Sequence, residues 1–141
     1  NAFSRCEQLT EVTLPSTVKT LSATCFAWCY SLSEITLPEG LQDISTFVFN
    51  TCPLKRVEIP STVTMVNDRS FANISVLEEV VFKKPADGSV GAPPKIDPRA
   101  FENSGTAGKP IKFYWPKEWT ESPPDKLWNA INASPDNVIR Y

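Results

Sequence analysis

The sequence has no histidine, a single methionine and only five glycines. Without histidine it lacks the commonest general base, the group that activates serine and cysteine nucleophiles, and the usual ligand of catalytic zinc. It also has no G-x-G-x-x-G, Walker, EF-hand or G-x-S-x-G motif, so neither a phosphate-binding loop nor a serine nucleophile is indicated. We therefore expect no enzyme activity and no cofactor. Catalysis by carboxylates alone, as in glycosidases, needs none of these motifs and stays open.

Long apolar runs and an excess of one charge are also missing. No run reaches the roughly 18 apolar residues that indicate a membrane-spanning helix. The 14 lysines and arginines nearly balance 16 aspartates and glutamates, for a formal net charge of −2. Because a nucleic-acid-binding protein would present a basic stripe to the phosphates, we expect neither a nucleic-acid partner nor a membrane span. With 41% hydrophobic residues, the 141-residue chain can form one domain with a substantial core.

A repeat of about 23 residues runs through most of the chain. Its first column consists of Phe3, Phe26, Phe49, Phe71 and Phe101. The next columns are Cys6, Cys29 and Cys52, then Leu9, Leu32, Leu54 and Leu77, and then Val12, Ile35, Val57 and Val80. The spacing falls from 23 to 22 at Cys52-Pro53-Leu54, and every later column shifts with it. Such a coordinated shift identifies a true structural repeat.

Each early repeat ends a short apolar alternation with a proline, as in Val12, Leu14 and Pro15. Alternating apolar residues suit a short strand with one buried face, and proline ends that strand because it has no N–H to donate. A single repeat cannot bury its apolar side chains, whereas stacked repeats can. The repeat therefore predicts a curved solenoid with one strand per repeat on one face and turns or short strands on the other.

The segment from Ala2 to Pro15 resembles the BspA-like leucine-rich repeats of bacterial surface proteins, and the pattern recurs in Cys25–Pro38 and Phe49–Pro60. The resemblance is close over residues 1–82 and looser up to Pro116. It implies a leucine-rich-repeat solenoid, a β-rich, curved right-handed coil. It also implies a non-catalytic adhesion module, extracellular or at the cell surface of a bacterium, that binds a protein or glycan of a host or neighbouring cell. The alternative is a structural spacer that presents a neighbouring domain.

Two insertions interrupt the predicted array, which we expect to span residues 1–116. The first is a Pro/Gly-rich loop at 83–95, and the second is a loop at 104–110. Neither composition suits a packed element, so both are expected on the surface. The chain opens partway through a repeat, which suggests a longer parent protein.

Residues 117–141 depart from the repeat and are expected to cap the array within the same domain. A short helix is predicted over Asp125–Asn132, with prolines in its first turn and Leu127 and Trp128 on its apolar face. A last short strand is predicted at Val138-Ile139. An open solenoid end exposes core and strand edge, which is why a differing terminal segment suits a cap.

Three of the four cysteines, Cys6, Cys29 and Cys52, share one column, and Cys25 precedes Phe26. Adjacent repeats would bring their Cα atoms within disulfide range, and the spacing of Cys25 and Cys29 allows a metal site. Side chains in one column point in parallel, however, and cysteine behaves as a small hydrophobe. We expect four free, buried thiols and no metal, with a disulfide or a metal site as the alternatives.

Strand residues that point away from the core form the predicted binding surface, on the concave face. One outward column runs Glu11, Glu34, Arg56, Glu79, Lys112, and its neighbour runs Thr13, Thr36, Glu58, Val81, Tyr114. Mixed charges also suit a solvated face with cross-strand ion pairs such as Glu34–Arg56 and Arg56–Glu79. The candidate binding residues are Glu11, Glu34, Arg56, Glu58, Glu79, Val81, Lys112 and Tyr114. The carboxylates fall in surface columns rather than in an obvious cleft.

An aromatic patch of Trp28, Tyr30 and Phe47 is the second candidate surface. Trp28 and Tyr30 occupy positions held by Arg5 and Glu7 in the first repeat, so the repeat itself does not require aromatic residues there. Exposed aromatic side chains anchor partners. They are equally suited to being covered by a loop or by another domain.

Overall fold

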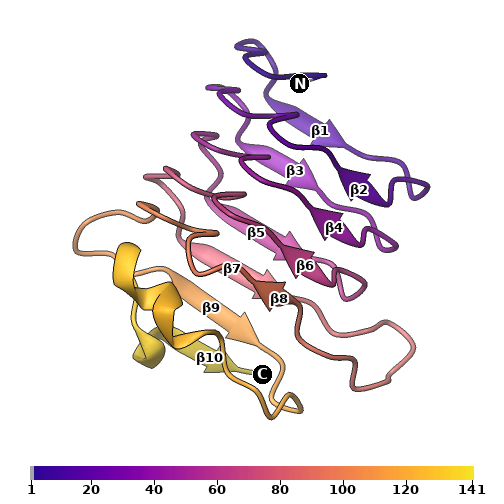
Figure 1. Ribbon diagram of the computed structural model, residues 1–141, viewed down its shortest axis with the longest axis vertical. Coiled ribbons are helices and arrows are strands. Elements are labelled where there is room, and N and C mark those ends of the chain that lie inside the picture. The colour runs from indigo at the N-terminus through magenta and orange to yellow at the C-terminus, as the bar shows by residue number, and fades with distance from the viewer. Residues whose placement is uncertain (1) are drawn as a thin grey trace.

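The computed structural model describes residues 2–141 and has the predicted β-solenoid architecture (Figure 1). Each turn of the coil, here called a rung, contributes a longer strand to one face and, in the first four rungs, a two-residue strand to the opposite face. The longer strands are β1 (Glu11–Thr13), β3 (Glu34–Thr36), β5 (Arg56–Ile59), β7 (Glu79–Phe82) and β9 (Lys112–Trp115). The two-residue strands are β2 (Thr20–Leu21), β4 (Asp43–Ile44), β6 (Met65–Val66) and β8 (Lys95–Ile96).

The named strands pair in parallel, and their register follows the sequence repeat. On one face β2, β4, β6 and β8 form a continuous sheet. On the other face, here called the long-strand face, β1 pairs with β3, while β5, β7 and β9 belong to a separate sheet. The repeat columns are therefore rows of neighbouring side chains, such as Leu21 beside Ile44 and Ile44 beside Val66. This arrangement confirms the predicted solenoid.

The phenylalanine column forms a continuous stack through the core. Along it, consecutive ring centroids lie 5.4, 5.6, 5.2 and 5.3 Å apart, with interplanar angles of 4°, 2°, 17° and 9°. Rungs separated by the strand spacing of about 4.8 Å hold the rings in offset, nearly parallel contact. All members are buried except Phe3, which is 49% exposed.

Residues with positive φ form two further columns, in the turns before the long strands. The first column holds Arg5, Trp28, Thr51, Asn73 and Asn103, and the second holds Thr24, Phe47 and Arg69. A left-handed conformation costs a non-glycine residue roughly 1–2 kcal/mol. In compensation, the N–H of Trp28 donates to the carbonyl of Asn50 over 2.9 Å, and that of Asn73 donates to Glu102 over 2.8 Å. These hydrogen bonds to the next rung hold the turns in register.

The predicted insertions at 83–95 and 104–110 lie largely in surface loops, although Lys95 belongs to β8 and Ser104 is buried. The first, between β7 and β8, extends furthest from the stack, at the lower right of Figure 1. The carbonyl of Val90 in this loop accepts a hydrogen bond from Trp119 Nε1 over 2.9 Å, which ties the loop to the C-terminal segment. The second loop contains an isolated antiparallel bridge between Thr106 and Lys109.

The C-terminal segment packs beside the last long strand. The predicted helix exists as a 3-10 helix, η1 (Asp125–Ala130), and Pro124 lies at its N-cap rather than in its first turn. A second 3-10 helix, η2 (Pro135–Asn137), leads into β10 (Val138–Arg140), which pairs in parallel with β9 and confirms the predicted last strand. Leu127 is buried, and Trp128 meets Phe113 edge-on, with centroids 5.4 Å apart. The division at residue 116 and the capping role stay predictions.

Candidate functional site

The two outward columns run across the long-strand face, and the strand pairing aligns their members. The aligned sets are Glu11 with Glu34, Arg56 with Glu79 and Lys112, and Glu58 with Val81 and Tyr114. The second column continues past its predicted end, because β10 places Ile139 beside Tyr114. Sequence reasoning identified Val138-Ile139 as a strand but did not assign it to this face.

Arg56 is held in place by two carboxylates. Its guanidinium lies 3.2 Å from the carboxylate of Glu58 and also donates to Glu79 on the neighbouring strand. Hydrogen bonding to Glu58, and then to Glu79, raises the pKa of Arg56 above its usual value. Since the side chain of Arg56 remains 51% exposed, such pairs contribute at most about 1 kcal/mol to stability. Their main effect is to orient the guanidinium. The Arg56–Glu79 pair was predicted, whereas the expected Glu34–Arg56 pair is not formed within residues 2–141.

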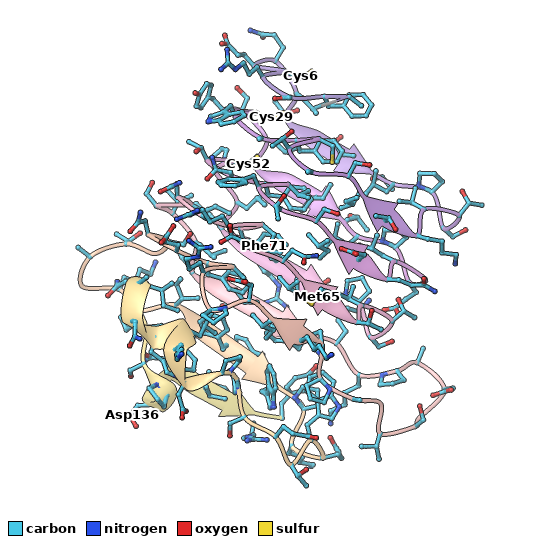
Figure 2. The ribbon with its side chains drawn as sticks, in the orientation of Figure 1. Cys6, Cys29, Cys52, Met65, Phe71 and Asp136 are labelled. Atoms are coloured by element: carbon cyan, nitrogen blue, oxygen red, sulfur yellow. The ribbon has the colours of Figure 1, made fainter. Side chains whose placement is uncertain are left out.

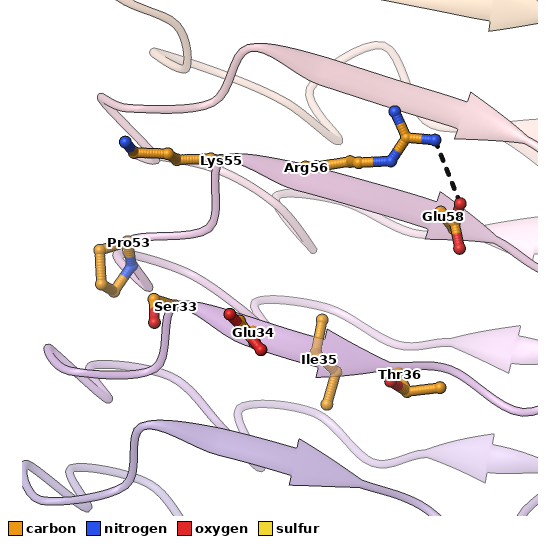
Figure 3. A pocket seen from close by; sticks show the side chains of 8 residues that line it. All are labelled: Ser33, Glu34, Ile35, Thr36, Pro53, Lys55, Arg56 and Glu58. Carbon is orange, nitrogen blue, oxygen red and sulfur yellow. Dashed lines mark hydrogen bonds and ion pairs between the residues drawn. The ribbon is translucent and has the colours of Figure 1, made fainter.

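The long-strand sheet is interrupted between β3 and β5, which lie side by side without β-pairing in the described chain (Figures 1 and 3). In the next rung, the carbonyl of Lys55 accepts a hydrogen bond from the N–H of Glu79 over 3.2 Å. The equivalent bond one rung earlier would join the N–H of Arg56 to the carbonyl of Ser33. Within residues 2–141 this bond is not formed.

The interruption coincides with the one-residue shortening at Cys52-Pro53-Leu54. In the preceding rung, the N–H of Leu32 donates to the carbonyl of Cys29, three residues back, over 3.0 Å. In the shortened rung, the N–H of Leu54 donates to Cys52, two residues back, over 2.9 Å. This tighter turn ends at Leu54, shortly before β5 begins at Arg56. The opposite face is unaffected, since β4 and β6 remain paired.

The two unpaired strands border a groove of about 570 Å³ (Figure 3). It is lined by Ser33, Glu34, Ile35, Thr36, Pro53, Lys55, Arg56 and Glu58. The expectation that the carboxylates avoid any cleft was wrong, because Glu34 and Glu58 border this groove. The sequence shows the shortened repeat but does not show that β3 and β5 fail to pair beside it.

Backbone groups in the groove are directed toward each other across the gap. In a trans peptide the carbonyl and the N–H point in opposite directions. Because the Lys55 carbonyl bonds toward β7, the N–H of Arg56 faces β3. Because the N–H of Glu34 bonds to the preceding rung, the carbonyl of Ser33 faces β5. The groove therefore offers a backbone donor and a backbone acceptor beside charged side chains.

The C-terminal end of the long-strand face is more apolar. Val81 was predicted to be an accessible outward residue, but it is only 9% exposed. Val81 lies outside the core cluster. Glu58 and Tyr114 flank it in the same column on the two neighbouring strands, where same-face side chains are within reach of each other. Ile139 on the edge strand is 37% exposed. The accessible apolar surface is thus shifted from β7 toward β10.

The candidate aromatic residues lie in the turns rather than on the strands. Trp28 and Phe47 have φ angles of 60° and 56°, and both are partly buried. The guanidinium of Arg5 lies 5.4 Å from the Trp28 ring centroid, and that of Arg69 lies 5.6 Å from the Phe47 centroid. Tyr30 is 54% exposed. Arginines therefore contact two of the three proposed anchors, which sequence spacing alone did not indicate.

All four cysteines are free thiols, and burial governs their chemistry. The thiol of Cys29 donates to the carbonyl of Phe3 over 3.0 Å, and that of Cys52 donates to Phe26 over 3.1 Å. Burial raises the pKa of Cys25 and Cys29 above their ordinary value, and that of Cys52 to about 12. These three thiols are protonated at neutral pH, so they are poor nucleophiles. Cys6 is only partly buried, which corrects the expectation that all four are buried.

Neither a metal cluster nor a membrane helix occurs in the described part of the chain. Among residues 2–141, no group of three or more histidine, cysteine, aspartate or glutamate side chains could hold a metal ion. Within the same residues, no helix is long and apolar enough to cross a membrane.

Comparison with known proteins places the fold among leucine-rich repeats. A family model described as "BspA type Leucine rich repeat region" matches residues 1–108 in 6 copies. No curated protein matches the chain. The crystal structure of a leucine rich cell surface protein from Faecalibacterium prausnitzii A2-165 is similar over 88% of this chain and 46% of that one, with 22% identity and a TM-score of 0.58. A leucine-rich repeat protein from Bacteroides ovatus ATCC 8483 matches over 94% and 50%, with 17% identity and a TM-score of 0.43. The chain therefore spans about half the length of these two proteins.

Proposed function

This chain belongs to the BspA-type leucine-rich repeat family, and we propose that it is a non-catalytic module that binds a partner through its long-strand face. The groove between β3 and β5 carries the proposal. Backbone groups that face a gap without a partner are uncommon in folded proteins. A partner with its own donors and acceptors would bond to the N–H of Arg56 and the carbonyl of Ser33.

The charges around the groove support a polar partner. Glu34 and Lys55 make no ion pair within residues 2–141, so both charges are available. Arg56 is already oriented by Glu58 and Glu79, which reduces the side-chain entropy lost on binding. A protein segment or a glycan that presents hydroxyl, amide or charged groups fits these features.

The family and one similar structure support a non-catalytic role at the cell surface. Solenoids of the leucine-rich type are typically binding scaffolds without catalysis. One similar structure is that of a leucine rich cell surface protein, and we extend this location to the present chain as a proposal. The module would lie outside a bacterial cell or on its surface, where it would adhere to a protein or glycan of a host or neighbouring cell.

A binding screen against immobilised matrix proteins and glycans tests the proposal. Arg56→Glu and Tyr114→Ala alter the long-strand face, whereas Lys95→Glu makes the same charge change as Arg56→Glu on β8 of the opposite face. We expect Arg56→Glu to weaken capture at least about tenfold, equivalent to roughly 1.4 kcal/mol, and Lys95→Glu to leave it unchanged. Capture that survives both face substitutions would contradict the proposal and direct attention to Trp28, Tyr30 and Phe47.

The spacer alternative is favoured by the unbroken phenylalanine stack, which gives the array a continuous rigid core. A spacer needs no ligand of its own. It predicts that no protein or glycan is captured and that outward substitutions have no effect. Substitutions that break a rung would still disturb it.

A further inference from the structure

We propose a second binding site, for a single neutral sugar ring, in a recess of the C-terminal segment. The recess has a volume of about 270 Å³ and lies where η1, η2 and β10 meet. Its main lining residues are Ser122, Pro123, Asp125, Trp128, Pro135 and Arg140. None of them belongs to the outward columns, so the site is independent of binding at the long-strand face.

Trp128 provides an oriented aromatic wall. Its ring meets the buried ring of Phe113 edge-on, at an interplanar angle of 87°, so the core sets its orientation. The indole N–H groups of Trp115 and Trp119 donate to backbone carbonyls over 2.8 and 2.9 Å. That of Trp128 has no hydrogen-bond partner within residues 2–141. Trp128 therefore lines the recess with an oriented aromatic ring, and no described residue occupies its N–H.

The polar groups of the recess carry opposite charges. Arg140 is fixed, because its Nη1 donates to the carbonyl of Trp119 over 2.6 Å and its Nη2 donates to Ser122 Oγ over 3.2 Å. Asp125, in the first turn of η1, makes no ion pair or hydrogen bond through its carboxylate within the described chain. Because Asp125 is exposed, its carboxylate is open to the hydrogen-bond donors of a ligand.

These features together match the chemistry of a sugar ring. One face of a sugar ring carries C–H groups that pack on an aromatic or proline surface, while its hydroxyls both donate and accept. Hydroxyls can donate to Asp125 and accept from the Trp128 N–H. Since the charges of Asp125 and Arg140 offset each other, the recess favours neither an anion nor a cation over a neutral ligand. The volume lies just below the range of about 300–1,000 Å³ for drug-sized ligands, so it suits one ring rather than a longer buried chain.

Titration with the methyl glycosides of glucose, galactose, mannose and N-acetylglucosamine tests the site, with the indole N–H signals observed by NMR. We expect at least one glycoside to shift the Trp128 signal saturably and to leave the Trp28 signal unchanged. Asp125→Asn should weaken binding at least about tenfold, while Asp136→Asn, an exposed η2 residue outside the recess (Figure 2), should not.

Trp128→Phe provides a second test, because phenylalanine keeps an aromatic contact to Phe113 but has no N–H. It should weaken binding while the Trp115 and Trp119 signals remain at their folded positions. The proposal is overturned if no glycoside produces a saturable shift, or if Asp125→Asn binds as tightly as the unmodified protein. Saturation of the recess by a proline-rich peptide but by none of the glycosides would overturn it as well.

Discussion

Phe71 and Phe101 are separated by 30 residues, yet their rings stack with centroids 5.3 Å apart, as closely as rings spaced by 22 or 23 residues. The extra residues leave the core as the loop between β7 and β8. Loop-closure entropy rises only slowly with loop length, so the insertion is tolerated while the stack continues. The aromatic column therefore sets the register of the array.

Phe71→Ala should lower the free energy of unfolding by about 3–5 kcal/mol, because it removes a fully buried ring from the middle of the stack. Phe3→Ala is the matched control, since Phe3 is 49% exposed and its ring has only one stacked neighbour among the described residues. Its cost should be clearly smaller. Urea denaturation followed by circular dichroism measures both, and equal losses would show that the stack does not dominate stability.

Substitution by alanine should have different effects on the stability of the protein at two buried serines. Ser104 Oγ donates to the carbonyl of Phe71 over 2.8 Å and accepts from the N–H of Ile74 over 3.0 Å. Ser70 Oγ has no hydrogen-bond partner within residues 2–141, and Ala100 occupies its place in the last repeat. We expect Ser104→Ala to cost about 1–3 kcal/mol and Ser70→Ala to be neutral or stabilising. A comparable loss in both variants would contradict the assigned hydrogen bonds.

Amide hydrogen exchange should reveal the interruption of the long-strand sheet. The N–H of Arg56 faces the groove and has no acceptor among the described residues, whereas that of Glu79 donates to the carbonyl of Lys55. We expect the Arg56 amide to exchange at least about tenfold faster than that of Glu79, since an unbonded amide needs no local opening before exchange. NMR-detected exchange in D2O resolves the two sites. Equal protection would mean that β3 and β5 pair in solution.

Thiol alkylation should distinguish Cys6 from the other cysteines. Cys6 is partly exposed, while Cys25, Cys29 and Cys52 are buried with raised pKa values. Iodoacetamide at pH 8 should therefore modify one thiol in the folded protein and all four after unfolding. Intact mass measures the number of adducts. Fewer than four adducts in the unfolded, unreduced chain would indicate a disulfide.

Stability should fall in strongly alkaline solution partly because of Cys52. Burial raises its pKa to about 12 in the folded protein, from an ordinary value of 9.0. Between these values the unfolded chain loses a proton that the folded chain retains, so rising pH favours unfolding, by up to about 1.4 kcal/mol per pH unit. The effect is absent below about pH 9. Cys52→Ala should flatten the dependence of the free energy of unfolding on pH between pH 9 and 12. An unchanged slope would exclude a contribution from this thiol.

The fold was predictable from columns of residues, whereas much of the site geometry was not. Strand positions such as those of Val57 and Val80 follow from spacing, because each rung contacts its equivalent one repeat away. The positive φ of Trp28 and Phe47 could not be inferred, since neither residue type signals a left-handed turn. The low exposure of Val81 was not predicted either, because exposure on this face depends on the assembled strands, which place Glu58 and Tyr114 on either side of it.

The amino-acid sequence alone determines the rung, its buried columns, the looped insertions and the last short strand, because these depend on repeated local patterns of apolar residues and proline. It also contains the shortened repeat at Cys52-Pro53-Leu54. Only the tertiary structure shows that the long-strand sheet is interrupted at the shortened rung while the opposite sheet stays intact. The reason is physical: the pairing of neighbouring strands depends on how whole rungs pack against each other, and no local pattern of residues specifies that packing.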